Sequence, residues 1–422
     1  MPAPTSEGPP SRASGVHYAW VVLGLIVLSV FGSLGLARFG YTSILPSMQA
    51  GLGLTNTQTG ELQSWNLLGY LLTVVPAGVL AARFGPRFVI AAALLVTGLA
   101  MILTGWAPTL AGARWGRFLA GVGGAGANVP AMGLVSAWFG ARRRGMATGI
   151  GVAGSSIGLM LTGPLVPAIL GWQGEQGWRV CWYVLGSLAL AIAAAAGLGL
   201  RNRPADQGLT PWGESDLERS QGGPRASALN WSLVYRSGAL WHLSAIYFAF
   251  GFSYIIYSTF FIRHLVHDGG LTAEQAGWLW LMVGLVSTVS GFIWGGVSDR
   301  WGRRTALIAV FSLQGLGFLV FGLSLKTAAI ALSAGLFALT AWSIPALMAA
   351  LAGDIFGGRL APAALGLMTV VFGIGQVLGP YVAGWIADGT RSFTPAFLLG
   401  GVAAWLLGVG GSFLLHPNIQ RR

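Results

Sequence analysis

Two arginines, Arg38 and Arg117, lie inside long runs of apolar residues. Charge is costly in such surroundings, so an arginine there is a first candidate for a functional group. At 1.5 Å per residue of helix, each lies about 12 Å from the same end of its run, counted from Pro46 and Thr109. Two guanidinium groups at one depth predict an anion site. The alternative is a structural role, in which the side chains snorkel or cap backbone carbonyls.

Polar and aromatic residues near these arginines, or on other apolar runs, are the candidate partners of a bound anion. Asn128 shares a helix face with Arg117, and Tyr41 lies close to Arg38 in its run. Tyrosine hydroxyls in apolar surroundings need hydrogen-bond partners, which a ligand can supply. For the aromatic members the alternative is packing. The predicted binding residues are Arg38, Tyr41, Arg117, Asn128, Tyr254, Tyr257 and Trp342.

The other reactive residues form no catalytic or metal-binding pattern. Cys181 is the single cysteine, which excludes a disulfide framework and a cysteine-rich metal site. His264 and His267 lie three residues apart, but two ligands are too few for a closed zinc site; a solvated interface or a pH-sensitive gate are the alternatives. We find no nucleophile paired with a base and no phosphate-binding loop. We therefore predict no cofactor, no metal site and no enzyme activity.

Composition places these residues in a membrane. Of the 422 residues, 54% are hydrophobic and 9% are charged, against about 25% charged in an average soluble domain. A helix needs about 20 apolar residues to cross a bilayer core. Runs of this length predict an all-α membrane protein with twelve helices, at residues 18–46, 58–82, 88–106, 109–138, 145–170, 178–200, 239–264, 272–297, 305–325, 328–352, 363–386 and 394–415.

The basic residues indicate the topology. The net charge is +12, but most of the 24 basic residues lie in short loops between apolar runs, which argues against a nucleic-acid partner. Such loops stay on the cytoplasmic side. We therefore predict a multi-pass protein of the plasma membrane, the bacterial inner membrane, with both termini cytoplasmic. The predicted divisions are a tail at 1–17, a six-helix bundle at 18–200, a cytoplasmic linker at 201–238, a second six-helix bundle at 239–415 and a tail at 416–422.

The two predicted bundles repeat one another. Residues 54–60 (LTNTQTG) recur as 271–277 (LTAEQAG), and residues 78–87 (GVLAARFGPR) recur as 295–304 (GGVSDRWGRR). A third match, Gly163-Pro164 with Gly379-Pro380, lies at nearly the same offset. The matches predict two similar halves in one orientation, the parallel repeat that some transporters build around a site at the membrane midplane.

The loop at 295–304 resembles the signature that follows helices two and eight in the major facilitator superfamily, and the resemblance covers nearly the whole chain. Arg117 with the glycines after it resembles the fourth-helix motif of that superfamily. Residues 37–41 and 251–257 are most similar to its YbfB-type branch, and there is a looser similarity to monocarboxylate and oxalate/formate carriers. One departure is that the run at 272–297 lacks the arginine expected of those carriers.

The resemblance implies two six-helix, pseudo-symmetric bundles with a cytoplasmic latch between them, for which Asp299, Arg300 and Arg303 are the candidates. Ala82 stands where the first copy of the motif has its aspartate, so the latch is expected only in the second copy. The alternative is that these residues merely mark topology. Small residues favour close helix packing and prolines favour bends, and packing is the preferred interpretation. The resemblance also implies bending as a gate at Gly163, Pro164, Gly379 and Pro380.

Together these features predict a secondary active transporter that works by alternating access. No acidic residue lies deep in a predicted helix, which argues against a cation as substrate. We expect a small organic anion such as a carboxylate, which crosses in exchange for a counter-anion or with a coupled proton. The alternative is an efflux carrier for amphipathic or drug-like compounds, in which the arginines are structural. The expected partners are this small-molecule substrate and the lipid bilayer, and the protein is expected to be a monomer.

Overall fold

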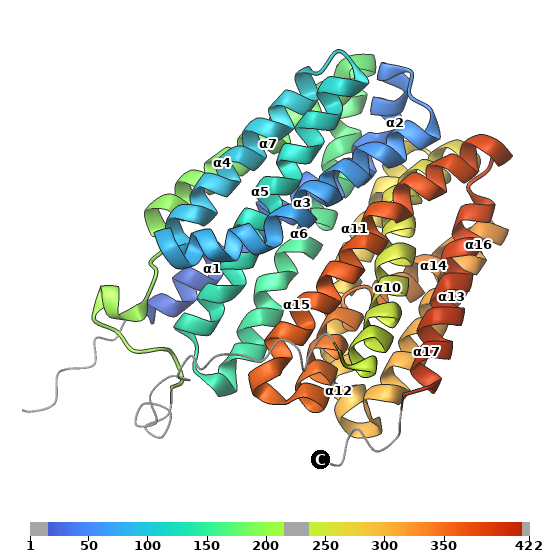
Figure 1. The fold of residues 1–422 in the computed structure, drawn as a ribbon. Coiled ribbons are helices and arrows are strands. Elements are labelled where there is room, and N and C mark those ends of the chain that lie inside the picture. Colours follow the sequence, from blue (N-terminus) through green and yellow to red (C-terminus); the bar gives the residue numbers. More distant parts are fainter. Residues whose placement is uncertain (1–15, 215–235, 416–422) are drawn as a thin grey trace, which may run out of the picture.

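Two bundles of helices lie side by side in the computed structural model, which describes residues 16–214 and 236–415 (Figure 1). Most of the two predicted tails and the middle of the predicted linker therefore lie outside the described residues. The N-terminal half contains α1 (Tyr18–Val30), the π-helix η1 (Phe31–Phe39), α2 (Gly40–Leu52), α3 (Asn56–Phe84), α4 (Pro86–Trp106), α5 (Leu110–Trp138), α6 (Ala141–Gln173), η2 (Gly174–Gln176) and α7 (Gly177–Gly199). The short helix η3 (Pro204–Gln207) follows it.

The C-terminal half is built in the same way. It contains α10 (Gly238–Arg263), η4 (His264–Asp268), α11 (Ala273–Ser287), α12 (Ser290–Trp301), α13 (Arg303–Leu323), α14 (Thr327–Thr340), α15 (Ser343–Thr390), α16 (Thr394–Ala403), η5 (Ala404–Val409) and α17 (Gly410–Phe413). The helix α15 combines two helices across a kink at Gly357.

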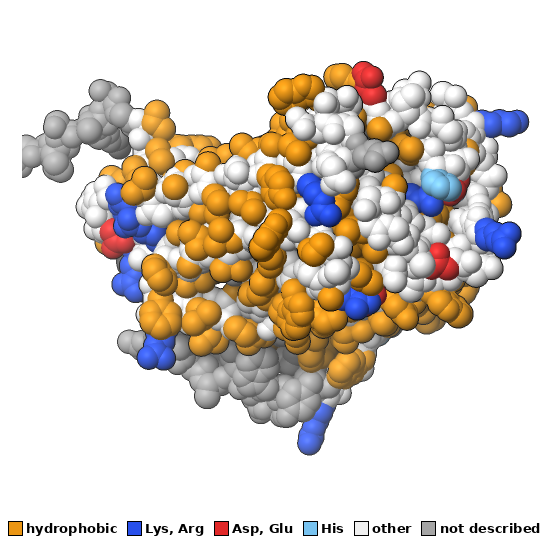
Figure 2. Space-filling model, turned by 90° about the horizontal axis from the view of Figure 1, so that it is seen from above, with side chains coloured by type: hydrophobic (Ala, Val, Ile, Leu, Met, Phe, Trp, Pro, Cys, Tyr) orange, Lys and Arg blue, Asp and Glu red, His pale blue; other side chains and the backbone are white. Residues whose placement is uncertain are grey.

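Twelve segments among the described residues are long and apolar enough to cross a membrane, which confirms the predicted fold class. They are Tyr18–Leu52, Asn56–Phe84, Pro86–Trp106, Leu110–Trp138, Ala141–Gln173, Gly177–Gly199, Gly238–Asp268, Ala273–Trp301, Arg303–Leu323, Thr327–Gly357, Leu360–Thr390 and Thr394–Phe413. Hydrophobic side chains cover a broad part of the surface in Figure 2. The first segment continues past its predicted end at Pro46, because one missing backbone hydrogen bond does not end this helix.

The sequence repeat corresponds to repeated helix ends. Thr55 and Thr272 each cap a helix in a capping box, one with Gln58 and the other with Gln275. The repeated loops each place a glycine at positive φ, Gly85 at 88° and Gly302 at 92°, a conformation that other residues rarely adopt. The repeated residues thus start and stop equivalent helices in the two halves.

We call the end of the bundle at which α1 begins, α7 ends and α10 begins the linker end, and the other the opposite end. The seam is the surface where α2, α3 and α6 of one half pack on α10, α15 and α11 of the other. Near the opposite end, Gly60 faces the carbonyl group of Pro380 and Gly163 faces that of Gly277, so closely that a Cβ atom would collide. The halves are therefore closed against each other near the opposite end.

Candidate functional site

Arg38 lies on η1, where the π-helix interrupts the first membrane segment; π-helical turns are frequent at functional sites. The residue is 6% exposed, and its Nε and Nη2 atoms have no hydrogen-bond partner among the described residues. These two nitrogens form one edge of the guanidinium group. Its central carbon lies 4.3 Å from the ring centroid of Tyr70. One edge of Arg38 is therefore free for the paired hydrogen bonds that guanidinium makes to a carboxylate.

Four neutral polar residues accompany Arg38, and with it we call them the seam cluster. In the N-terminal half, Asn128 Nδ2 on α5 donates to the hydroxyl oxygen of Tyr70 on α3 at 2.9 Å. In the C-terminal half, Gln376 Nε2 on α15 donates to the hydroxyl oxygen of Tyr254 on α10. Tyr254 lies close enough to Arg38 for an electrostatic interaction and a side-chain hydrogen bond, and it also lies near Tyr70. The cluster thus draws its members from both halves.

Arg117 differs from Arg38, although its guanidinium contacts Ala37, the residue before Arg38. It is fully buried within the N-terminal half. Its Nη1 donates to the carbonyl oxygen of Ala37 at 2.5 Å, and its Nη2 donates to Gln63 Oε1 at 2.7 Å. Tyr41 and Trp182 lie beside its guanidinium carbon, with centroids at 4.6 and 5.2 Å. Arg117 therefore ties α5 to η1, and the structural alternative accounts for its contacts in this conformation.

Two predicted tyrosines also point into their own halves. The Tyr41 hydroxyl donates to the carbonyl oxygen of Thr59 at 2.8 Å. The Tyr257 hydroxyl lies 2.7 Å from Ser333 Oγ, and its ring is surrounded by phenylalanines of the C-terminal half, including Phe337 with its centroid at 4.5 Å. Both tyrosines are almost completely buried. Packing explains the two rings without a ligand.

Trp342, the last predicted binding residue, lies at the seam. Its indole nitrogen donates to Ser156 Oγ at 2.9 Å, which joins the C-terminal half to α6. Its ring packs edge to face on Phe39, the residue after Arg38, with 5.5 Å between the ring centroids. The structure thus brings four of the seven predicted binding residues to the seam, namely Arg38, Asn128, Tyr254 and Trp342.

Sequence reasoning missed Tyr70 and Gln376. Both are polar residues inside predicted membrane helices, at 58–82 and 363–386. A search for charged residues and for one aromatic stripe passes over them. A census of every hydrogen-bonding side chain within the apolar runs would have included both residues, since such groups need partners there.

The predicted latch residues are engaged within the C-terminal half. Arg303 Nη1 lies 2.6 Å from Asp299 Oδ1, and Arg303 Nε lies 3.1 Å from Asp354 Oδ2. The guanidinium of Arg300 lies over the ring of Trp301 at 5.9 Å. These contacts join α12, α13 and α15 near the linker end, so the ion pairs of Asp299 and Arg303 do not bridge the halves here.

The glycine-proline pairs predicted as gates lie where helices touch closely. Gly163 packs on Gly277 across the seam, whereas Gly379 packs on Ile255 and Phe252 of its own half. Pro164 and Pro380 both lie inside helices that continue past them. Packing therefore accounts for the two glycines in this conformation, and bending remains a prediction.

Polar contacts across the seam are concentrated at the opposite end. Asp388 on α15 accepts hydrogen bonds from Asn56 N at 2.9 Å, from Thr57 N at 2.8 Å and from Thr57 Oγ1 at 2.5 Å, so it caps the first turn of α3 in the other half. Arg263 Nε donates in the reverse direction, to Gln49 Oε1 at 2.7 Å. We call Asp388 and Arg263 with these partners the opposite-end lock.

The histidines predicted to lie at a solvated interface, or alternatively at a gate, adjoin this lock. His264 is buried and lies 2.7 Å from Asp268, whereas the His267 side chain is 68% exposed. The solvated interpretation therefore fits only His267. Within residues 16–214 and 236–415, no group of three or more His, Cys, Asp or Glu side chains is placed to hold a metal ion.

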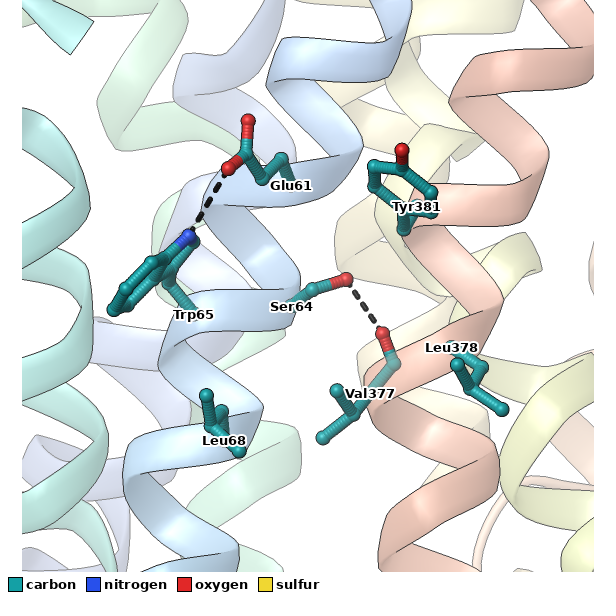
Figure 3. A pocket seen from close by; sticks show the side chains of 7 residues that line it. All are labelled: Glu61, Ser64, Trp65, Leu68, Val377, Leu378 and Tyr381. Atoms are coloured by element: carbon teal, nitrogen blue, oxygen red, sulfur yellow. Dashed lines mark hydrogen bonds between the residues drawn. The ribbon is translucent and has the colours of Figure 1, made fainter. Parts of the chain in front are cut away.

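A small cavity of about 150 Å³ lies between α3 and α15 and is shown in Figure 3. Three of its polar side chains have partners: Glu61 lies 2.6 Å from Arg114 and accepts from Trp65 Nε1 at 3.1 Å, and Ser64 donates to the carbonyl oxygen of Val377 at 2.6 Å. The remaining lining is mostly apolar. None of the described side chains that line this cavity is cationic, so it offers an anion nothing comparable to the free edge of Arg38.

The described residues form twelve membrane-length helices in two similar halves, with an unpaired cationic edge where the halves meet. These are features of a membrane transporter. Comparison with known proteins agrees. Residues 30–410 match the model of the family described as "Uncharacterised MFS-type transporter YbfB". The chain belongs to this family, within the major facilitator superfamily, which confirms the predicted family and shows that it is a transporter and not an enzyme.

Named relatives cover nearly the whole chain. A probable sulfoacetate transporter, SauU, of Cupriavidus necator is 27% identical over 94% of this chain and 93% of its own length. A putative tartrate transporter of Agrobacterium vitis is 25% identical over 89% of this chain and 85% of its own. The crystal structure of a bacterial homologue of the human lysosomal transporter Spinster, in an inward-facing and occupied conformation, superposes with a TM-score of 0.74 at 16% identity, over 95% of this chain and 97% of its own.

Proposed function

We propose that this protein is a secondary active transporter that carries a small organic anion, most simply a carboxylate, by alternating access. The observation that carries the proposal is the unpaired edge of Arg38, an almost buried cation between the two halves. Relatives named for sulfoacetate and tartrate transport support an anionic substrate. Since one chain supplies the whole seam cluster, we further propose that a monomer is sufficient.

The state of the seam supports alternating access. The opposite end is closed by the Gly60 and Gly163 contacts and by the opposite-end lock. The latch ion pairs at the linker end stay within one half. A carrier needs two states in which different ends are closed, and closure at the opposite end is consistent with one of them. Coupling is proposed to be anion exchange or proton symport, because the members of the seam cluster include no carboxylate.

Purified protein should bind carboxylates. We expect a thermal-shift panel of small carboxylates, with the corresponding primary amides as uncharged controls, to show stabilisation by one or more carboxylates and not by the matched amides. Counterflow in proteoliposomes with the stabilising anion then tests transport. Stabilisation by amphipathic cations and by no carboxylate would instead support the efflux alternative.

Orientation can be tested with single cysteines in a Cys181→Ala background. We propose that the linker end is cytoplasmic, because basic residues at helix ends, such as Arg83, Arg87 and Arg142, lie there. Gln207 lies in η3 after the N-terminal half, and Gln173 ends α6 at the opposite end; both are exposed. An impermeant thiol reagent applied to intact bacterial cells should label Gln173→Cys and not Gln207→Cys. The reverse result would invert the proposed topology and would place the linker end outside the cell.

A further inference from the structure

The two tyrosine hydroxyls of the seam cluster are both hydrogen-bond acceptors for an amide. Asn128 Nδ2 donates to Tyr70 at 2.9 Å, and Gln376 Nε2 donates to Tyr254. A phenol hydroxyl carries one hydrogen of its own. Since the amide hydrogen occupies a lone pair of the oxygen, the hydroxyl hydrogen is left to donate to another group. The hydroxyl group of each tyrosine can therefore act as a hydrogen-bond donor.

Both tyrosines lie next to Arg38. The guanidinium carbon lies 4.3 Å from the ring centroid of Tyr70, and Tyr254 is close enough to Arg38 for an electrostatic interaction and a side-chain hydrogen bond. Guanidinium nitrogens can only donate. The free edge and the two hydroxyls together present four donor hydrogens, two on Arg38 and one on each tyrosine. Only Arg38 among them carries a charge.

We propose that Asn128 and Gln376 are positioning residues that make Tyr70 and Tyr254 donors, and that the substrate is a small carboxylate bearing a second oxygen acceptor, such as a hydroxyl or keto group. This inference rests on the proposed function. The carboxylate takes the charged edge of Arg38, and the neutral tyrosine hydroxyls take the second oxygen. A simple alkanoate has no second oxygen group, so it binds Arg38 through its carboxylate and leaves the tyrosine hydroxyls without a partner.

Each amide and its tyrosine belong to the same half. Asn128 and Tyr70 lie on α5 and α3, while Gln376 and Tyr254 lie on α15 and α10. Movement of one half relative to the other therefore leaves both pairs intact. The donors keep their polarity in either state, whereas the distance between Arg38 and Tyr254 changes as the seam opens.

Three carboxylates of similar size test the proposal: propionate, lactate and pyruvate, measured by calorimetry on the purified full-length protein. We expect lactate or pyruvate to bind about tenfold more tightly than propionate, as one hydrogen bond of about 1.4 kcal/mol would give. Gln376→Met and Asn128→Leu should each reduce this preference, the ratio of lactate or pyruvate affinity to propionate affinity, about threefold or more.

A double-mutant cycle separates positioning from direct contact. In a Tyr254→Phe background, Gln376→Met should have no further effect on the preference. The matched control is Tyr257→Phe, which removes a buried hydroxyl paired with Ser333 inside the C-terminal half. This control should leave the preference unchanged, so a loss specific to the seam cluster cannot be attributed to a missing buried hydroxyl.

The outcomes distinguish this inference from the proposed function. Equal affinity for all three anions overturns the inference and leaves anion binding at Arg38 standing. The inference is also overturned if Gln376→Met lowers the preference over propionate equally in the wild-type and Tyr254→Phe backgrounds. If none of the three anions binds to wild-type protein, the inference fails, and the wider carboxylate panel then decides the proposed function.

Discussion

Arg38→Gln should weaken carboxylate binding about tenfold to a hundredfold while the fold remains intact. The variant removes a charge whose Nε and Nη2 have no protein partner among the described residues, so no buried contact of those atoms is lost. A hydrogen bond to a charged group contributes about 1.5 to 3 kcal/mol, which corresponds to this change in affinity. Arg38→Lys should restore little, because an ammonium group cannot form the paired contact of a guanidinium edge.

Arg117→Gln is the matched comparison: it should lower the stability of the protein, whereas Arg38→Gln should lower its affinity for the anion. It breaks contacts to the Ala37 carbonyl and to Gln63 inside the N-terminal half. Leaving those buried acceptors unpaired should cost about 1 to 3 kcal/mol of stability each. We therefore expect a lower unfolding temperature, with binding reduced only through distortion of η1.

Binding isotherms and thermal unfolding of the three variants at matched expression provide the measurement. Unchanged anion affinity in Arg38→Gln would contradict the proposed function and would favour the amphipathic efflux alternative. A selective loss of affinity in Arg117→Gln, without a loss of stability, would restore the prediction that both arginines bind the anion.

Asp388→Asn should shift the conformational equilibrium toward a state open at the opposite end. Its carboxylate accepts three hydrogen bonds from the first turn of α3 across the seam. A carboxylate at a helix N-terminus also interacts favourably with the helix dipole. Loss of the charge should remove about 1.5 to 3 kcal/mol, which changes the ratio of the two states by roughly tenfold to a hundredfold.

Accessibility of a buried seam position reports that shift. Thr42 is 1% exposed and donates to the carbonyl oxygen of Ser258 across the seam at 2.7 Å. In a Cys181→Ala background, Thr42→Cys should react faster with an impermeant thiol reagent applied at the opposite end when Asp388→Asn is present. The control is Asp299→Asn, which removes a carboxylate from an ion pair within one half. Equal rates with and without Asp388→Asn would show that this lock does not hold the closed state.

Features that depend on nearby residues could be read from the sequence. Twelve apolar runs gave twelve membrane segments, because a hydrophobic length of helix is a local property. The repeated motifs marked equivalent helix ends, since a capping box and a positive-φ glycine act within a few residues. The argument for an anion likewise used only local features, namely the charges of Arg38 and Arg117 within apolar runs and the lack of deep carboxylates.

Only the tertiary structure decided which way each side chain points. Depth along a helix follows from the rise per residue, but direction depends on how the helix is rotated against its neighbours and on the π-helical turn at η1. Arg117 reaches the residue before Arg38, yet Arg38 has a free edge at the seam and Arg117 is bound inside its half. Tyr70 and Gln376 come from helices far apart in the chain, and only the packing of the two halves brings them to the same cluster.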